Sequence, residues 1–199
     1  MTICCPSIAC TPPYLQDDYF ITKLDDPSDY GPTRPNLETP SGVDWPSFTA
    51  AIENARERLE ENAPGTGLVV VEGFLLLASA GDDVAASDQT SSSALPLFDA
   101  IFFLNCPGEE CLRRRLARNP DRTAEQAAGL RGYWHNCTWP GYLKYTVPVL
   151  QKLQHASDER LVVIDAMRSE TEVISAVLDA ATTHPRLPML RRYRPSRKL

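Results

Sequence analysis

The chain has 199 residues, of which 43% are hydrophobic, and 26 acidic residues outnumber 20 Lys and Arg to give a formal net charge of −6. This length and composition are typical of one folded domain with a buried core, which excludes a largely disordered protein. The acidic balance argues against nucleic-acid binding, because that function needs a basic surface to neutralise phosphates.

No targeting or membrane segment is predicted. No apolar run approaches the roughly 20 residues that cross a bilayer, and residues 1–10 lack the charged and long apolar regions of a secretion signal. We therefore expect a cytoplasmic protein without a membrane partner. The six cysteines show no CxxC pair, so the sequence predicts neither a zinc site nor a disulfide framework.

Two adjacent carboxylates, Asp17 and Asp18, lie between aromatic residues in the stretch YLQDDYF at 14–20. A surface turn explains this stretch as well as a functional site does, because Asp is common where chains reverse. The next segment, 44–62, predicts an amphipathic helix whose apolar residues recur at helical spacing, with Asp44 able to cap its start.

Three short apolar runs, at 68–73, 100–105 and 161–165, predict doubly buried strands, since they are rich in Val, Ile and Phe without polar alternation. Helical patterns lie between them, which indicates an α/β domain with a parallel sheet. Glu72 ends the first run and should emerge at the carboxyl edge of that sheet, where such folds bind ligands. Magnesium binding and a plain salt bridge or helix cap are both compatible with this position.

Residues 78–94 are small and polar and predict a flexible insertion, and the basic end of the chain predicts a solvated tail. Pro107 should open a helix with glutamates in its first turn. Its arginines, Arg113, Arg114, Arg115 and Arg118, crowd together in an acidic protein. Either a bound phosphate or the nearby Glu109 and Glu110 would relieve their repulsion.

Two further helices are predicted towards the carboxyl end. One runs from Trp139 to about His155, although Pro148 removes a backbone donor and should kink or shorten it. The last begins at Ser169, which forms a capping box with Glu172 before an apolar run at helical spacing.

Four segments in this order, QDDYF, VVVEGFLLL, ECLRRRLAR and TWPGYLKY, with GYW just before the fourth, resemble the nicotinamide riboside kinase family. This family is related to uridine kinase within the P-loop kinases, and the resemblance covers residues 14 to about 182. It implies a three-layer α/β domain over 1–183, with a parallel sheet flanked by helices, a lid at 111–135 and a basic tail at 184–199.

The function implied by this resemblance is transfer of the γ-phosphoryl group of ATP to the 5′-hydroxyl of nicotinamide riboside, a step of pyridine nucleotide salvage and NAD biosynthesis. ATP would be the co-substrate and Mg²⁺ the cofactor. Asp17 matches the catalytic base, which accepts or orients the hydroxyl proton and helps to hold Mg²⁺ with Glu72.

Other site residues are assigned by the same resemblance. Asp18, Tyr19 and Phe20 would line the substrate side, and Asp44 with Arg115 would hold the ribose hydroxyls. Arg114 and Arg118 resemble lid arginines that close over ATP, and Arg168, Ser169 and Glu170 resemble the loop near adenine. Val43 stands where some family members carry an aromatic residue against the pyridine ring.

One expected motif is absent from the sequence. P-loop kinases hold phosphates with a GxxxxGK[ST] segment, and nothing before Asp17 resembles it. We therefore expect the first strand and phosphate loop to be missing or replaced, which would separate strands at the centre of the sheet. A chain so shortened should be poorly stable and inactive. The alternatives are a non-catalytic nucleoside-binding or interaction protein, and a kinase of uridine or another nucleoside.

Overall fold

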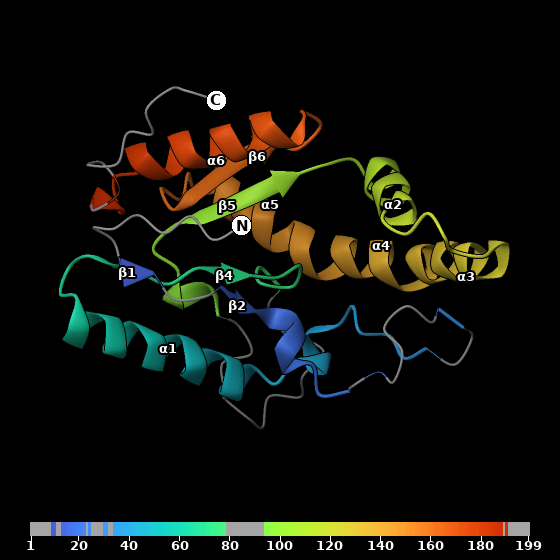
Figure 1. The fold of residues 1–199 in the computed structure, drawn as a ribbon, viewed down its shortest axis with the longest axis horizontal. Coiled ribbons are helices and arrows are strands. Elements are labelled where there is room, and N and C mark those ends of the chain that lie inside the picture. The colour runs from blue at the N-terminus through green and yellow to red at the C-terminus, as the bar shows by residue number, and fades with distance from the viewer. Residues whose placement is uncertain are drawn as a thin grey trace.

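The computed structural model describes residues 9–10, 13–22, 24, 30–31, 34–78, 94–188 and 190. Most of the insertion predicted at 78–94, and all but the first residues of the tail predicted at 184–199, lie outside this part of the chain. The described residues form a mixture of helices and short parallel strands (Figure 1), which agrees with the α/β class predicted from the sequence.

The strands are β1 (Ala9–Cys10), β2 (Tyr14–Leu15), β3 (Gly67–Leu68), β4 (Val71–Glu72), β5 (Ile101–Asn105) and β6 (Leu161–Asp165). The α-helices are α1 (Trp45–Asn62), α2 (Gly108–Ala117), α3 (Ala124–Tyr133), α4 (Trp139–Gly141), α5 (Val147–His155) and α6 (Glu170–Thr183). Shorter turns of helix are η1 (Gln16–Tyr19), η2 (Pro40–Gly42), η3 (Leu95–Leu97), and the π-helical η4 (Trp134–Thr138) and η5 (Tyr142–Thr146).

The strands form three parallel pairs, β1–β3, β2–β4 and β5–β6, and no pairing joins these pairs within the described residues. The apolar run at 68–73 is interrupted, because β3 ends at Leu68 and β4 begins at Val71. The prediction of doubly buried strands was wrong. In the part of the chain that the structure describes, each strand has one paired neighbour. Side chains of the three apolar runs, such as Val70 (43% exposed), Leu104 (51%) and Val163 (43%), remain open to solvent.

Helix α1 confirms the amphipathic pattern predicted for 44–62. Its residues Phe48, Ile52 and Ala55 are almost fully buried in the main hydrophobic core. Asp44 caps the helix, since its Oδ1 accepts a hydrogen bond from the Ser47 amide at 3.1 Å. In Figure 1 this helix lies below the β2–β4 pair, so it covers one side of those strands.

Helix α2 also forms as predicted, with Pro107 as its N-cap residue and Glu109 and Glu110 in its first turn. The helical run from α3 to α5 is almost continuous, and Pro148 lies near the start of α5 without ending it. The π-helical turns η4 and η5 lie between the α-helical pieces of this run. Such a turn changes the backbone bonding pattern locally, so the chain can accommodate a proline without breaking the helix.

Helix α6 begins with the predicted capping box, in which Ser169 and Glu172 bond each other's backbone amides. The residues just after it pack on the domain, because His184 and Leu187 are buried and His184 contacts the Phe102 ring. Within the described residues, none of the helices combines the length and apolar composition required to cross a bilayer.

Candidate functional site

A large cavity of about 1440 Å³ lies between the β2–β4 pair and the β5–β6 pair. Most of its wall is apolar and comes from the segments 67–77 and 97–104 and from helix α6. Four of the predicted site residues line the same cavity: Asp17, Glu72, Arg115 and Arg118. They come from η1, β4 and α2 with its C-cap, so distant segments of the sequence contribute charged groups to one cavity.

Strand pairing and one buried side chain fix the position of Asp17 relative to Glu72. Leu15 in β2 is in register with Glu72 in β4, so η1 starts beside the end of β4. Gln16 is fully buried there, and its Oε1 accepts a hydrogen bond from the Leu75 amide at 2.9 Å. Gly73 is required at this contact, because a Cβ at position 73 would lie 2.5 Å from the Gln16 Cβ.

The surroundings of Asp17 make its carboxylate a stronger proton acceptor than that of a free aspartate. Burial raises the pKa of its carboxyl group, the positive charge of Arg115 lowers it, and the neighbouring Asp18 raises it again. The net effect is a raised pKa. A carboxylate whose pKa is raised in a cavity is a better proton acceptor than a fully solvated one, which suits general-base chemistry.

Arg115 contacts tyrosine rather than the predicted partner Asp44. Its guanidinium donates a hydrogen bond to the Tyr30 hydroxyl at 2.9 Å. The Tyr30 ring also lies against Arg34, whose guanidinium carbon is 4.1 Å from the ring centroid and 5.0 Å from that of Tyr133. Arg115, Tyr30, Arg34 and Tyr133 thus form one cationic and aromatic cluster beside Asp17.

Glu38 is a site residue that the sequence did not indicate. It lines the cavity, is only 5% exposed, and its Oε1 accepts a hydrogen bond from the Thr138 hydroxyl at 3.0 Å. Burial raises the pKa of its carboxyl group, while the Thr138 hydrogen bond and the nearby Arg115 lower it. The backbone of α4 packs closely here, because a Cβ at Gly141 would lie 2.6 Å from the Glu38 carbonyl oxygen.

Of the other predicted residues of QDDYF, Tyr19 and Phe20 belong to the hydrophobic core and Asp18 does not. Tyr19 packs against Phe48 with ring centroids 5.0 Å apart, and Phe20 is buried and bridges to Val43. Asp18 is exposed. These three residues, predicted to line the substrate side, are not in the wall of the large cavity.

Asp44 and Val43 lie at the start of α1. The Asp44 side chain caps the helix, and its hydrogen bonds with Ser47 lower the pKa of the carboxyl group. Neither a hydrogen bond nor an ion pair joins it to Arg115 in the described structure, and it is not in the wall of the large cavity. Val43 is 3% exposed and belongs to the hydrophobic core.

The arginines of α2 divide into two groups. Arg113 and Arg114 both bind Glu110, with nitrogen to oxygen distances of 2.6 Å, and these hydrogen bonds lower the pKa of Glu110 to about 2. Arg114 also donates to the Ala166 carbonyl at 2.8 Å, which ties α2 to the end of β6. Ion pairs with Glu110 therefore explain the positions of Arg113 and Arg114. Arg115 and Arg118 instead line the cavity.

The predicted adenine segment lies at the start of α6 and outside the wall of the large cavity. Arg168 forms an exposed ion pair with Asp165 at 3.7 Å, and Ser169 caps the helix. Glu170 is exposed in the first turn. These three residues are thus near one another but are not brought to Asp17.

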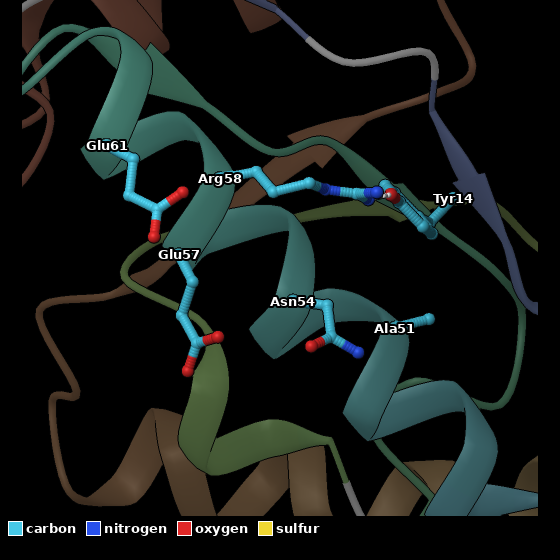
Figure 2. Close-up of a pocket in the computed structure, with 6 residues that line it drawn as sticks. All are labelled: Tyr14, Ala51, Asn54, Glu57, Arg58 and Glu61. Carbon is cyan, nitrogen blue, oxygen red and sulfur yellow. Dashed lines mark hydrogen bonds between the residues drawn. The ribbon is translucent and has the colours of Figure 1, made fainter.

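A smaller pocket of about 380 Å³ lies on the outer surface of α1 (Figure 2). Figure 2 shows Arg58 extended towards Tyr14, whose hydroxyl accepts a hydrogen bond from it at 3.2 Å, while Glu57 and Glu61 point away. None of the predicted site residues lines this pocket. The large cavity is therefore the candidate site.

Three known proteins resemble the chain. Nicotinamide riboside kinase 1 of Homo sapiens is 29% identical to it over 132 residues, which cover 64% of this chain and 55% of that protein. The proteins of the same name from Rattus norvegicus and Mus musculus are each 29% identical over 119 residues, covering 60% of this chain and 50% of theirs. No protein-family model matches the chain.

This distant homology supports a resemblance to nicotinamide riboside kinases at the level of the family. The chain spans about half the length of the relatives that it matches.

Proposed function

We propose that the chain carries the nucleoside side of a P-loop kinase-type site, which phosphorylates nicotinamide riboside with ATP to give nicotinamide mononucleotide. The observation that carries this proposal is the meeting of Asp17, Glu72, Arg115 and Arg118 at one cavity. Phosphoryl transfer depends mainly on alignment and on stabilisation of charge, and this set offers a proton acceptor and two cations for that purpose.

Asp17 would accept or orient the proton of the 5′-hydroxyl, and Arg115 beside it would hold the sugar. Arg118 would approach the phosphates of ATP from the end of α2. Asp44, the segment from Arg168 to Glu170, and Asp18, Tyr19 and Phe20 keep their assigned roles as part of this proposal. Arg114, which binds Glu110 and the Ala166 carbonyl in the described structure, is the alternative phosphate ligand to Arg118. Asp44 and Ser169 cap helices and Tyr19 and Phe20 pack in the core, so a change of conformation on binding would have to redirect these four side chains.

Magnesium fits this site only as an ion shared with the nucleotide. The described residues contain no group of three or more His, Cys, Asp or Glu side chains that could hold a metal alone. Mg²⁺ in phosphoryl-transfer enzymes is bound through one or two carboxylates together with phosphates and water. Asp17 and Glu72 would supply these carboxylates, and the ion when bound would neutralise phosphate charge.

The corresponding fold would be a three-layer P-loop kinase-type domain over 1–183, with 111–135 acting as a lid and 184–199 as a tail. ATP and the riboside would be the small-molecule partners, in the cytoplasm and without nucleic acid or membrane. Two observations support this fold: the mixture of helices with parallel strand pairs, and the distant kinase homology.

Direct binding and product analysis test the proposal. Isothermal titration of nicotinamide riboside should show saturable binding that Arg115→Ala weakens, and incubation with ATP and Mg²⁺ should be followed by chromatography of the nucleotide products. Uridine is the matched competitor, because it shares the ribose and differs in the base. Binding of neither riboside would contradict the proposal, and binding of uridine alone would assign another nucleoside.

A second candidate is a nucleoside-binding protein without catalysis. The 199 residues contain no GxxxxGK[ST] segment, which is the phosphate cradle of P-loop kinases, and this candidate function needs none. Saturable riboside binding without product formation would support this candidate. Normal turnover by the 199-residue chain would exclude it and would mean that another segment holds the phosphates.

A further inference from the structure

Two cysteines lie on either side of the start of helix α2. Pro107 is the N-cap residue of this helix, so Cys106 directly precedes the cap and Cys111 is the fourth residue of the helix. Side chains at these two positions often pack against each other and fix the path of the chain into a helix. The spacing therefore places the two thiols next to one another.

The hydrogen bonds agree with this placement. The Cys111 thiol donates to the Cys106 carbonyl oxygen at 3.8 Å, and the Cys111 amide donates to the Pro107 carbonyl at 3.0 Å. Burial, followed by a hydrogen bond with the Cys106 side chain and by repulsion from it, raises the pKa of the Cys111 thiol to about 11. Arg114 lowers this pKa and Glu110 raises it, both by smaller amounts. The two cysteine side chains are thus in contact.

A small solute can reach both thiols. Cys106 and Cys111 are partly exposed, and both line the cavity of about 1440 Å³. Cys137 in η4 is also partly exposed, but it is not in the wall of this cavity. The thiol pair therefore differs from Cys137 in having both a neighbouring thiol and an open approach from the cavity.

The start of α2 is closely packed against the helical run that follows α3. A Cβ at Gly108 would lie 2.7 Å from the Trp139 ring, which stacks on Tyr142 with ring centroids 4.9 Å apart. A bond between the two sulfur atoms would close the loop 106–111 around this first turn. Such a bond restricts the opening of the segment that it encloses.

We propose that Cys106 and Cys111 form a reversible disulfide, which hydrogen peroxide oxidises and a small thiol reduces, and that this disulfide locks the start of α2. The helix carries Arg115, and its C-cap residue is Arg118, both of which line the cavity. The redox state of the thiol pair would therefore set how firmly this helix is held. The inference depends on the thiols and their surroundings, so it stands independently of the proposed kinase function.

The reaction begins at Cys106, because Cys111 keeps its proton at neutral pH. The Cys106 thiolate attacks one oxygen of the peroxide, the O–O bond breaks, and the products are a sulfenic acid at Cys106 and one molecule of water. Cys111 then loses its proton and attacks the oxidised sulfur, which forms the S–S bond and releases the sulfenic oxygen as a second water. Two thiols are oxidised by two electrons, and one peroxide is reduced to two waters.

Peptide mass spectrometry of the full chain tests the proposal. After oxidation with hydrogen peroxide and blocking of the remaining thiols, cleavage after Glu110 separates Cys106 from Cys111, so a disulfide between them joins two peptides. We expect these joined peptides, and dithiothreitol should separate them again. Oxidation should also slow hydrogen exchange of the Cys111 amide several-fold, because its bond to the Pro107 carbonyl closes the first turn.

Matched variants assign the two thiols to their steps. Cys111→Ser removes the second thiol, so peroxide should leave a sulfenic acid at Cys106 that dimedone traps. In Cys106→Ser, Cys111 should stay largely unmodified under the same conditions. Cys137→Ser is the control, and it should form the disulfide as the unmodified chain does. Circular dichroism establishes that each variant folds.

Three results would overturn the proposal. The first is that the two peptides are not joined, whether or not Cys106 is modified by peroxide. The second is that Cys106 is joined to a different cysteine. The third is unchanged exchange of the Cys111 amide in the oxidised chain, which would mean that the disulfide does not hold the start of α2.

Discussion

The carboxyl group of Glu38 accepts a hydrogen bond from the Thr138 hydroxyl at 3.0 Å, although the two residues are 100 positions apart in the sequence. This contact joins the loop before α1 to the helical run that follows α3. Since Glu38 also lines the cavity with Asp17 and Arg115, it connects the candidate site to the fold.

The first prediction concerns stability and pH. Burial raises the pKa of Glu38 above its usual 4.5, so the folded chain keeps this proton to a higher pH than the unfolded chain does. Its contribution to stability is therefore complete below about 4.5 and is lost as the pH rises through the folded pKa. Glu38→Gln should flatten the fall of melting temperature with pH in this range, measured by calorimetry.

The exposed Glu109 on α2 provides the control, because Glu109→Gln removes a carboxyl group of the same type without touching the cavity. An unchanged pH profile for Glu38→Gln would show that Glu38 does not titrate differently in the two states.

The second prediction separates catalysis from binding at Asp17. In a chain extended with a strand and a GxxxxGK[ST] loop, Asp17→Asn should lower turnover by roughly 10²–10⁴-fold, because it removes the proposed general base while keeping the shape of the side chain. The dissociation constant of the riboside should change far less. Steady-state kinetics and isothermal titration measure the two effects, and unchanged turnover would remove Asp17 from the catalytic role.

The third prediction distinguishes two roles of Asp44. Asp44→Ala should lower the melting temperature by a few degrees, because it removes the cap of α1, whereas Asp44→Ser can keep that cap. If Asp44 also holds the ribose, both variants should bind the riboside more weakly. Normal riboside affinity in Asp44→Ser would leave only the capping role.

A fourth prediction compares two arginines at the end of α2. Arg118→Ala should weaken ATP binding with little change in stability, since Arg118 is exposed and lines the cavity. Arg114→Ala should instead destabilise the fold by about 1 kcal/mol, because it removes the bonds to Glu110 and to the Ala166 carbonyl. Urea unfolding and ATP titration of both variants measure the difference. The reverse pattern would make Arg114 the phosphate ligand.

The fifth prediction concerns magnesium. Glu72→Gln removes the charge of one of the two carboxylates proposed to hold the ion, so the active extended chain should need a higher Mg²⁺ concentration for half-maximal rate. Asp99→Asn, at an exposed carboxylate that also borders the cavity, is the control. A magnesium titration identical to that of the unmodified chain would exclude Glu72 from metal binding.

Local patterns predicted most of the regular structure. The apolar periodicity of α1, the capping box of α6 and the runs that became β5 and β6 are each encoded within a few neighbouring residues. Each element formed where it was predicted, although the two strands are not buried on both faces. The break between β3 and β4 was not predictable in this way. Its Val-rich sequence is typical of a continuous buried strand, and whether such a run pairs along its length depends on partners elsewhere in the chain.

The residues that line the candidate site were predicted only in part for the same reason. Asp17, Glu72, Arg115 and Arg118 could be found because they stand in recognisable segments or at the end of a strand. Glu38 belongs to no recognisable sequence motif. Its burial depends on contacts with Thr138 and Gly141, which lie far along the chain. For Asp44 the sequence left two roles open, because an Asp immediately before a helix is compatible both with a helix cap and with a ligand contact.

The close fit of Gly73 against Gln16 helps to set the separation between the carboxylates of Asp17 and Glu72. Any side chain at position 73 would push Gln16, and with it the turn that carries Asp17, away from the strand that carries Glu72. Substituted residues here would therefore alter the separation of the two carboxylates without replacing either of them. In a mutational scan read out by metal dependence, position 73 should behave like a functional residue although glycine has no side chain to contribute.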